Sequence, residues 1–89
     1  MSQLNWRVHR DSGAALRDIR NDLGLTLRNV HHASLTLAMR KNDGRLAISA
    51  SGLFEIETKG RVPSMHRLYA LSIIYKRPLC ELLLLYGIG

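Results

Sequence analysis

Apolar residues recur every three or four positions along most of this 89-residue chain. The first such stripe contains Leu16, Ile19 and Leu23, and similar stripes run over residues 27–38 and 65–75. This spacing places the apolar side chains on one face of an α-helix. The pattern predicts five helices and little else, which makes an all-α domain.

Residues that begin or end helices separate these stripes. Ser, Thr and Asp side chains accept hydrogen bonds from the free N–H groups of a first turn, glycine ends helices, and proline suits a first turn. The second stripe continues to about Arg40, and Leu46-Ala47-Ile48 is expected to be extended. The expected capping, turn and breaking residues are, in chain order, Asp11 or Ser12, Gly24, Thr26, Asn42-Asp43-Gly44, Ser49, Gly60, Pro63-Ser64 and Pro78.

The size and charge of the chain narrow its class. Eighty-nine residues suit one compact domain. Thirteen Lys and Arg stand against seven Asp and Glu, which gives a formal net charge of +6. Such a surface attracts polyanions, meaning nucleic acid first and anionic membranes or acidic proteins second. We expect residues 1–11 to form a basic tail and residues 12–89 to form the folded domain.

Other features favour a cytoplasmic protein without a cofactor. Cys80 is the only cysteine, which suits a reducing compartment. The N-terminus lacks the apolar segment of a signal peptide, and the longest apolar run, at 82–86, is far shorter than the roughly 20 residues of a membrane helix. The four histidines and Cys80 lack the spacing of a zinc site, so no metal is expected. Because no catalytic motif is present, we do not expect an enzyme.

Residues 16–74 carry a series of motifs in a specific order. They are Leu16-Arg17-x-x-Arg20, then Gly24-Leu25-Thr26-Leu27, then Ile48-Ser49-x-x-x-Leu53-x-x-Ile56-Glu57, then Gly60, Pro63, Ser64, Leu68 and Leu71. Together they resemble the phage-repressor/Cro (XRE-like) family of helix-turn-helix DNA-binding domains. The resemblance implies a five-helix repressor-like domain whose third helix, at 49–59, lies in the major groove of double-stranded DNA while the second braces it. It implies a sequence-specific transcriptional regulator, or the DNA-binding domain of one.

The resemblance also implies an ion pair between Arg20 and Glu57. The pair would orient the first helix against the end of the third. Removing one partner of a buried pair typically costs about 3–5 kcal/mol. The alternative interpretation is two solvated charges, which would contribute little.

The connection between the second and third helices departs from the family. A helix-turn-helix usually has a turn of 3–4 residues, whereas the chain between Ser34 and Ile48 is longer than the family norm by about a dozen residues. We interpret the extra length as a longer second helix, a turn and a short link back. Arg40, Lys41 and Arg45 would then lie on a protrusion that either contacts the DNA backbone or is merely solvated.

The third helix offers few strong base readers. Ala50 can contact a thymine methyl group, Ser51 can hydrogen-bond to several bases, and Glu55 can accept from a cytosine amine, but none is a bidentate reader. Phe54 is expected to pack in the core. Residues expected to contact phosphates around this helix are Arg28, Lys59, Arg61 and Arg67. Arg7 and Arg10 of the basic tail are placed to reach a minor groove.

The C-terminal leucines favour association of two chains. Four consecutive leucines cover every side of a helix, and one domain face cannot bury them all, so either a partner chain or further protein covers the rest. A symmetric homodimer is the usual solution. Its expected interface contains Leu79, Leu82, Leu83, Leu84 and Tyr86, with Cys80 as a buried small hydrophobe. The alternative function is a helix-turn-helix protein-interaction module, such as an antitoxin or adaptor, that uses this segment and the insertion.

Overall fold

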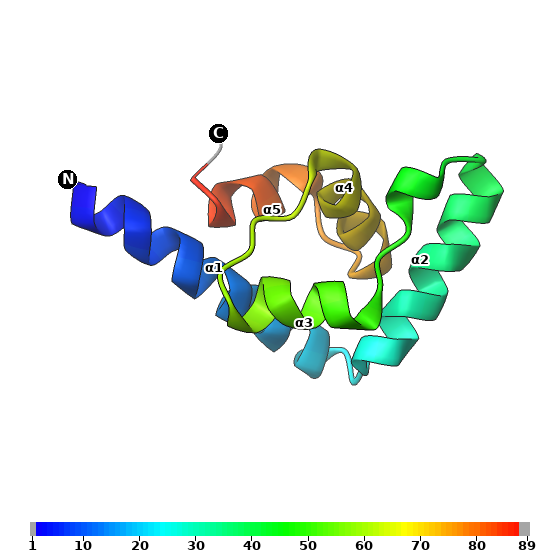
Figure 1. Cartoon of the computed structure of the whole chain (residues 1–89), viewed down its shortest axis with the longest axis horizontal. Helices are drawn as coiled ribbons and strands as arrows, with labels where there is room; N and C mark the ends of the chain where they lie inside the picture. The colour runs from blue at the N-terminus through cyan, green and yellow to red at the C-terminus, as the bar shows by residue number, and fades with distance from the viewer. Residues whose placement is uncertain (1, 88–89) are drawn as a thin grey trace.

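The computed structural model describes residues 2–87, and it describes side chains over residues 12–87. The described residues form five α-helices and one 3-10 helix and contain no strand, which confirms the predicted all-α class. The elements are α1 (Ser2–Asp22), α2 (Leu27–Lys41), η1 (Gly44–Leu46), α3 (Ala50–Thr58), α4 (Met65–Ile74) and α5 (Leu79–Leu85) (Figure 1).

Helix α1 begins earlier than the sequence predicted. Its backbone is helical from Ser2, so the expected cap at Asp11 or Ser12 is wrong, because both residues lie inside the helix. Residues 2–11 contain no glycine or proline that would stop a helix. The Ser12 hydroxyl instead donates a hydrogen bond to the Leu85 carbonyl, which ties α1 to the end of α5. The side chains of Arg7 and Arg10 lie outside the described residues.

Helix α2 has the predicted cap and nearly the predicted length. The Thr26 hydroxyl accepts from the Asn29 N–H (3.0 Å), and the Asn29 side chain accepts from the Thr26 N–H (2.9 Å), a reciprocal capping box. The helix ends at Lys41 because Asn42 adopts the left-handed conformation, with φ of 52°. Residues 46–48 were expected to be extended, but Leu46 belongs to η1, whereas Ala47 is extended as predicted.

Predicted caps also begin the next helices. The hydroxyl of Ser49 accepts from the Gly52 N–H at the start of α3, and the hydroxyl of Ser64 accepts from the Arg67 N–H at the start of α4. Pro78 directly precedes α5. Local chemistry therefore sets where α2, α3 and α4 begin.

One shared core holds these helices together. Helix α1 packs on α3 and α5, α2 packs on η1, α3 and α4, and α4 packs on α5. The largest fully buried side chains are Tyr75, Leu16, Ile48, Leu53, Leu68, Leu71, Leu82 and Val30. One prediction of burial is wrong: Phe54 is 47% exposed, because η1 packs on α2 and α4 and leaves it uncovered. Cys80 is exposed on α5 of the single chain, and its burial in a dimer interface stays a prediction.

Helices α1 and α3 meet at a glycine. A Cβ atom at Gly13 would lie 2.4 Å from the Ile56 carbonyl oxygen and 2.9 Å from that of Glu57. Only a residue without a side chain allows the backbone of α1 to approach the last turns of α3 this closely. This contact fixes where α3 ends on the domain.

Candidate nucleic-acid interface

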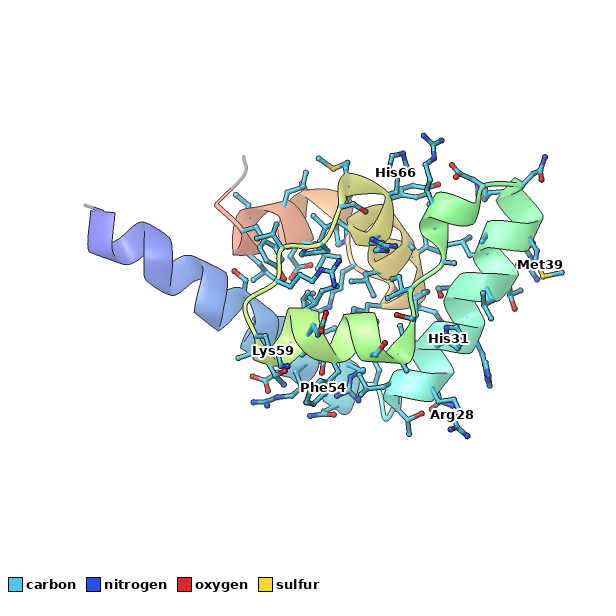
Figure 2. The ribbon with its side chains drawn as sticks, viewed as in Figure 1. Arg28, His31, Met39, Phe54, Lys59 and His66 are labelled. Atoms are coloured by element: carbon cyan, nitrogen blue, oxygen red, sulfur yellow. The ribbon has the colours of Figure 1, made fainter. Side chains whose placement is uncertain are left out.

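Helix α3 has a buried side and an open side. Leu53, Ile56 and Glu57 face the interior. Ser51 and Phe54 are exposed, and Ala50 and Glu55 are half-buried. Figure 2 shows Phe54 on the side of α3 that faces away from α4 and α5. The three residues predicted to read bases, Ala50, Ser51 and Glu55, therefore share the open side with Phe54.

The structure contains the ion pair that the resemblance implies. Arg20 Nε donates to Glu57 Oε2 at 2.7 Å, and a second guanidinium nitrogen donates to Oε1 at 2.9 Å. The Glu57 side chain is 2% exposed and that of Arg20 is 11% exposed. The hydrogen bond to Glu57 raises the pKa of Arg20. A third nitrogen of Arg20 donates to the Leu25 carbonyl at 2.8 Å, so one side chain joins α1, the α1–α2 link and α3.

Two tyrosines lie close enough to this pair to sense its charge. Burial, followed by the Glu57 charge, raises the pKa of Tyr75 above its ordinary value and raises the pKa of Tyr86 to about 12. The Tyr75 hydroxyl is buried and has no hydrogen-bond partner among the described residues. Such a group is costly to bury, so the core around the ion pair tolerates one unsatisfied donor.

Side chains of α2 hold the residue that leads into α3. His31 Nδ1 lies 2.7 Å from the Ile48 carbonyl oxygen, and the Ser34 hydroxyl accepts from the Ile48 N–H at 2.9 Å. Ser34 is fully buried and Ile48 is 1% exposed. We call His31 and Ser34 the Ile48 clamp. Sequence reasoning missed it, because nothing in the spacing of His31, Ser34 and Ile48 signals contact across 14 or 17 positions.

Two of the residues predicted to contact phosphates lie along one edge of the molecule and form no ion pair with any residue that the structure describes. Arg28, in the first turn of α2, and Lys59, which ends α3, are exposed and form no ion pair within the described part of the chain. Figure 2 shows both along the same edge of the view as Phe54, and His66 on the opposite edge. The α3 edge, defined by Arg28, Phe54 and Lys59, is therefore basic at both ends.

The other two cations line a cavity at the start of α3. The cavity has a volume of about 250 Å³, and its lining includes Ser49, Gly52, Ser64, Arg61 and Arg67. Arg67 Nε donates to the Ala47 carbonyl at 3.3 Å, which leaves its other two nitrogens without a partner among residues 12–87. Two guanidinium groups beside the first turns of α3 and α4 suit a phosphate.

Glu55 and Arg61 form an ion pair with each other. Arg61 donates to the Glu55 carboxylate at 2.7 Å, and the two side chains are 41% and 61% exposed respectively. An exposed pair of this kind contributes little stability. A predicted base reader and a predicted phosphate contact are thus paired in the absence of a ligand, and a phosphate would compete for Arg61.

The end of α2, where the extra residues between α2 and α3 begin, lies far from the α3 edge. Arg40 and Lys41 are at the end of α2, which at 1.5 Å per residue is about 18 Å along the helix from Arg28. Arg45 donates twice to Asp43, at 2.9 Å each, and these hydrogen bonds lower the pKa of Asp43 to about 2. The length of α2 therefore separates Arg40 and Lys41 from Arg28, and Arg45 is occupied by Asp43.

The predicted dimer residues divide between core and surface. Leu82 and Tyr86 are buried, and Leu79 and Leu83 are partly buried against the same core. Helix α5 packs on both α1 and α4, so one chain covers more of it than expected, and Leu82 and Tyr86 are not available to a partner. Leu84, at 65% exposed, is the predicted dimer residue that remains open to solvent.

An apolar groove lies elsewhere on the molecule, and sequence reasoning did not find it. Its volume is about 460 Å³, and its lining includes Leu46, Met65, His66, Tyr69 and Leu79. Met65 is 52% exposed and Tyr69 is 37% exposed. The spacing of four between these two residues, which places them on one face of α4, is the signal in the sequence that could have found it.

Searches of the described residues for other kinds of site found neither a membrane helix nor a metal site. No helix among residues 2–87 combines the length and the hydropathy needed to cross a membrane. The same residues contain no group of three His, Cys, Asp or Glu that could hold a metal ion. Comparisons of the chain with protein-family models, with curated proteins and with solved structures found no match.

Proposed function

We propose that this protein is a DNA-binding transcriptional regulator, or the DNA-binding domain of one, whose α3 enters the major groove of duplex DNA while α2 braces it as in a helix-turn-helix. The observation that carries the proposal is the distribution of positive charge around α3. Arg28 and Lys59 stand free on the α3 edge, and Arg61 and Arg67 line the cavity at its beginning. Cations on both sides of a helix fit the phosphates that border a groove.

The open side of α3 suits modest sequence discrimination. Ala50 and Ser51 are small and allow close approach to base edges. Phe54 offers an apolar surface for a thymine methyl group, a contact that its expected burial would have excluded. Glu55 reaches a cytosine amine once Arg61 turns to a phosphate. We expect DNA shape to contribute to specificity, because no bidentate reader is present.

The proposal is tested by a salt titration. Binding to a random-sequence duplex is measured by fluorescence anisotropy for the wild type, Arg28→Ala, Lys59→Ala and Arg40→Ala. We expect affinity to fall steeply with salt, and the slope of log K against log salt to become shallower by about one unit in Arg28→Ala and Lys59→Ala. Arg40→Ala, an exposed arginine at the far end of α2, is the matched control and should match the wild type.

Two results contradict the proposal or its details. Absence of binding by the wild type even at low salt would exclude duplex DNA as the partner. An Arg40→Ala slope as shallow as that of Lys59→Ala would show that charge acts without regard to position, against a defined α3 edge.

The second candidate function is a protein-interaction module, such as an antitoxin or adaptor. The apolar groove is the observation that favours it, because exposed Met65 and Tyr69 border a cavity larger than the one beside α3. Grooves of this kind accept apolar side chains of a partner. A wild type that binds no DNA would turn the search to protein partners, with Tyr69→Glu as the variant that should abolish capture.

A further inference from the structure

The chain that joins α2 to α3 cannot by itself fix the angle between them. In an ordinary helix-turn-helix, a turn of three or four residues joins the end of one helix directly to the beginning of the next, so the two joined ends lie close together. Here α2 continues from Ser34 to Lys41, about 10 Å further along its axis, before the chain turns back through η1. The covalent link therefore meets α2 far from the place where α3 packs on it. Noncovalent contacts must set the orientation of α3.

The Ile48 clamp is placed to do this. Ile48 precedes Ser49, the cap of α3, so fixing the backbone of Ile48 fixes the first turn of that helix. The Ile48 N–H donates to Ser34 Oγ, and the Ile48 carbonyl accepts from His31 Nδ1. The Ser34 hydroxyl lies 2.7 Å from the His31 carbonyl oxygen and 3.3 Å from the Ile48 carbonyl oxygen, so its proton goes to the nearer His31 carbonyl and His31 Nδ1, at 2.7 Å, is the closer donor to the Ile48 carbonyl. Both backbone groups of one residue are thus held by side chains one helical turn apart on α2.

We propose that His31 is the positioning residue for α3, acting through the Ile48 carbonyl. The inference rests on the proposed function, since it assigns His31 the task of presenting α3 to DNA in place of the missing short turn. A carbonyl oxygen only accepts, so His31 carries its proton on Nδ1. His31 lies on α2 beside the beginning of α3, whereas its neighbour His32 is exposed (Figure 2).

A conservative replacement of His31 can keep the hydrogen bond to the Ile48 carbonyl. The side-chain amide nitrogen of asparagine lies about where Nδ1 of histidine lies, so His31→Asn keeps a donor for the Ile48 carbonyl. His31→Ala removes the donor and leaves that carbonyl without it. His32→Ala is the matched control, because His32 is the adjacent histidine, its side chain is exposed, and its ring centroid lies 5.6 Å from that of His31.

The first measurement needs no DNA. Residual dipolar couplings of backbone amides give the angle between α2 and α3 in the wild type and the three variants. We expect His31→Ala to change this angle or to broaden the couplings of residues 50–58, and His31→Asn and His32→Ala to retain the wild-type values. An unchanged angle in a folded His31→Ala protein would overturn the proposal, whatever the protein binds.

The second measurement is affinity for the random-sequence duplex at one low salt concentration. We expect a loss of at least about tenfold for His31→Ala, recovery to within about threefold of wild type for His31→Asn, and no change for His32→Ala. Equal losses in His31→Ala and His31→Asn would show that the ring itself is needed, against a positioning role. If the wild type binds no duplex, the proposed function fails, and the dipolar couplings still decide the role of His31.

Discussion

At the scale of single residues, Arg20 and Glu57 form the least exposed ion pair among the described residues. Both carboxylate oxygens of Glu57 are used, and Arg20 reaches a third acceptor on the α1–α2 link. Burying such a pair costs desolvation free energy, so the pair is better evidence for orientation than for net stability. The loss of one partner, in contrast, leaves an uncompensated charge in the core.

We expect Glu57→Ala to destabilise the domain by about 3–5 kcal/mol, because Arg20 would keep a buried charge without its partner. At roughly 4–8 °C per kcal/mol for a domain of this size, the melting temperature should fall by more than about 12 °C in a thermal scan followed by circular dichroism. Glu55→Ala, which breaks an exposed pair, is the control and should change stability by about 1 kcal/mol or less. A small shift for Glu57→Ala would mean that the pair is solvated.

Tyr75 gives a prediction in alkaline solution. Its pKa is raised in the folded state, as is that of Tyr86, so the folded protein holds protons that the unfolded chain releases above about pH 10. The contribution of these two tyrosines to stability should therefore be constant below about pH 10, and stability should fall as the pH rises from there toward 12, measured by urea unfolding at each pH. Tyr75→Phe should make this decline shallower.

At neutral pH the same variant tests the unsatisfied hydroxyl. Removing a buried donor that lacks a partner should leave the midpoint of urea unfolding unchanged or raise it. A loss of more than about 1 kcal/mol in Tyr75→Phe would reveal that the hydroxyl has a partner. The Arg20–Glu57 pair is untouched in this variant, so the two effects are separable.

At the scale of elements, features that depend on hydrogen bonds between residues close in sequence could be predicted from the sequence. Thr26, Ser49 and Ser64 cap the helices assigned to them, because a cap depends on hydrogen bonds within four residues. The start of α1 was wrong because residues 2–11 have no stop signal and a cap-type residue was preferred. Burial was predicted less well. Phe54 is exposed because its environment is set by distant elements, and spacing along one helix does not report these.

Gly13 shows what sequence alone could have found. An isolated glycine in line with an apolar helical stripe often has a packing reason, and Gly13 lies three residues before Leu16, where the first stripe begins. The identity of the facing element, the end of α3, depends on the tertiary fold. The Ile48 clamp gave no signal of this kind, since serine and histidine are ordinary residues within a helix.

We expect Gly13→Ala to destabilise the domain by about 2 kcal/mol or more. The new Cβ would meet backbone oxygens at 2.4 and 2.9 Å, and overpacking of this type typically costs about 1–3 kcal/mol even against movable side chains. The roughly 1 kcal/mol by which alanine favours a helix over glycine offsets only part of this. Chemical denaturation gives the difference directly.

Gly44→Ala is the matched control for this contact. A Cβ at Gly44 would meet nothing within 4 Å, so its stability should lie within about 0.5 kcal/mol of wild type. A Gly13→Ala protein as stable as the Gly44→Ala protein would mean that α1 and α3 can separate without cost. In that case Gly13 would have no role in placing the end of α3.

At the scale of the whole molecule, the basic and apolar surfaces are separate. The α3 edge carries Arg28 and Lys59, and His66, which lines the apolar groove, lies on the opposite edge (Figure 2). An anionic partner bound at the α3 edge would therefore leave the apolar groove uncovered. A homodimer would place two α3 helices on half-sites roughly 34–36 Å apart, provided that its interface leaves both edges free.

We expect the protein to associate through its C-terminal helix and predict that Leu84→Glu yields a particle of 10.1 kDa in light scattering, the mass of one chain. Leu84 is 65% exposed, so the charge should not disturb the fold. Met39→Glu, on the exposed side of α2, is the control and should leave a dimer intact. Dimers that persist in Leu84→Glu would exclude this part of α5 from the interface.

The route of the chain from α2 to α3 has a consequence for how this protein can vary. If hydrogen bonds to Ile48 rather than chain continuity hold α3 in place, then residues 42–45 end α2 and turn the chain but do not set the angle between α2 and α3. Lineages of such a protein would be free to lengthen, shorten or decorate this stretch, and its ends could even be separated, with new termini opened at Gly44, where neighbouring atoms leave open space. The position of α3 would then be inherited through two side chains of α2 and not through the loop between the helices.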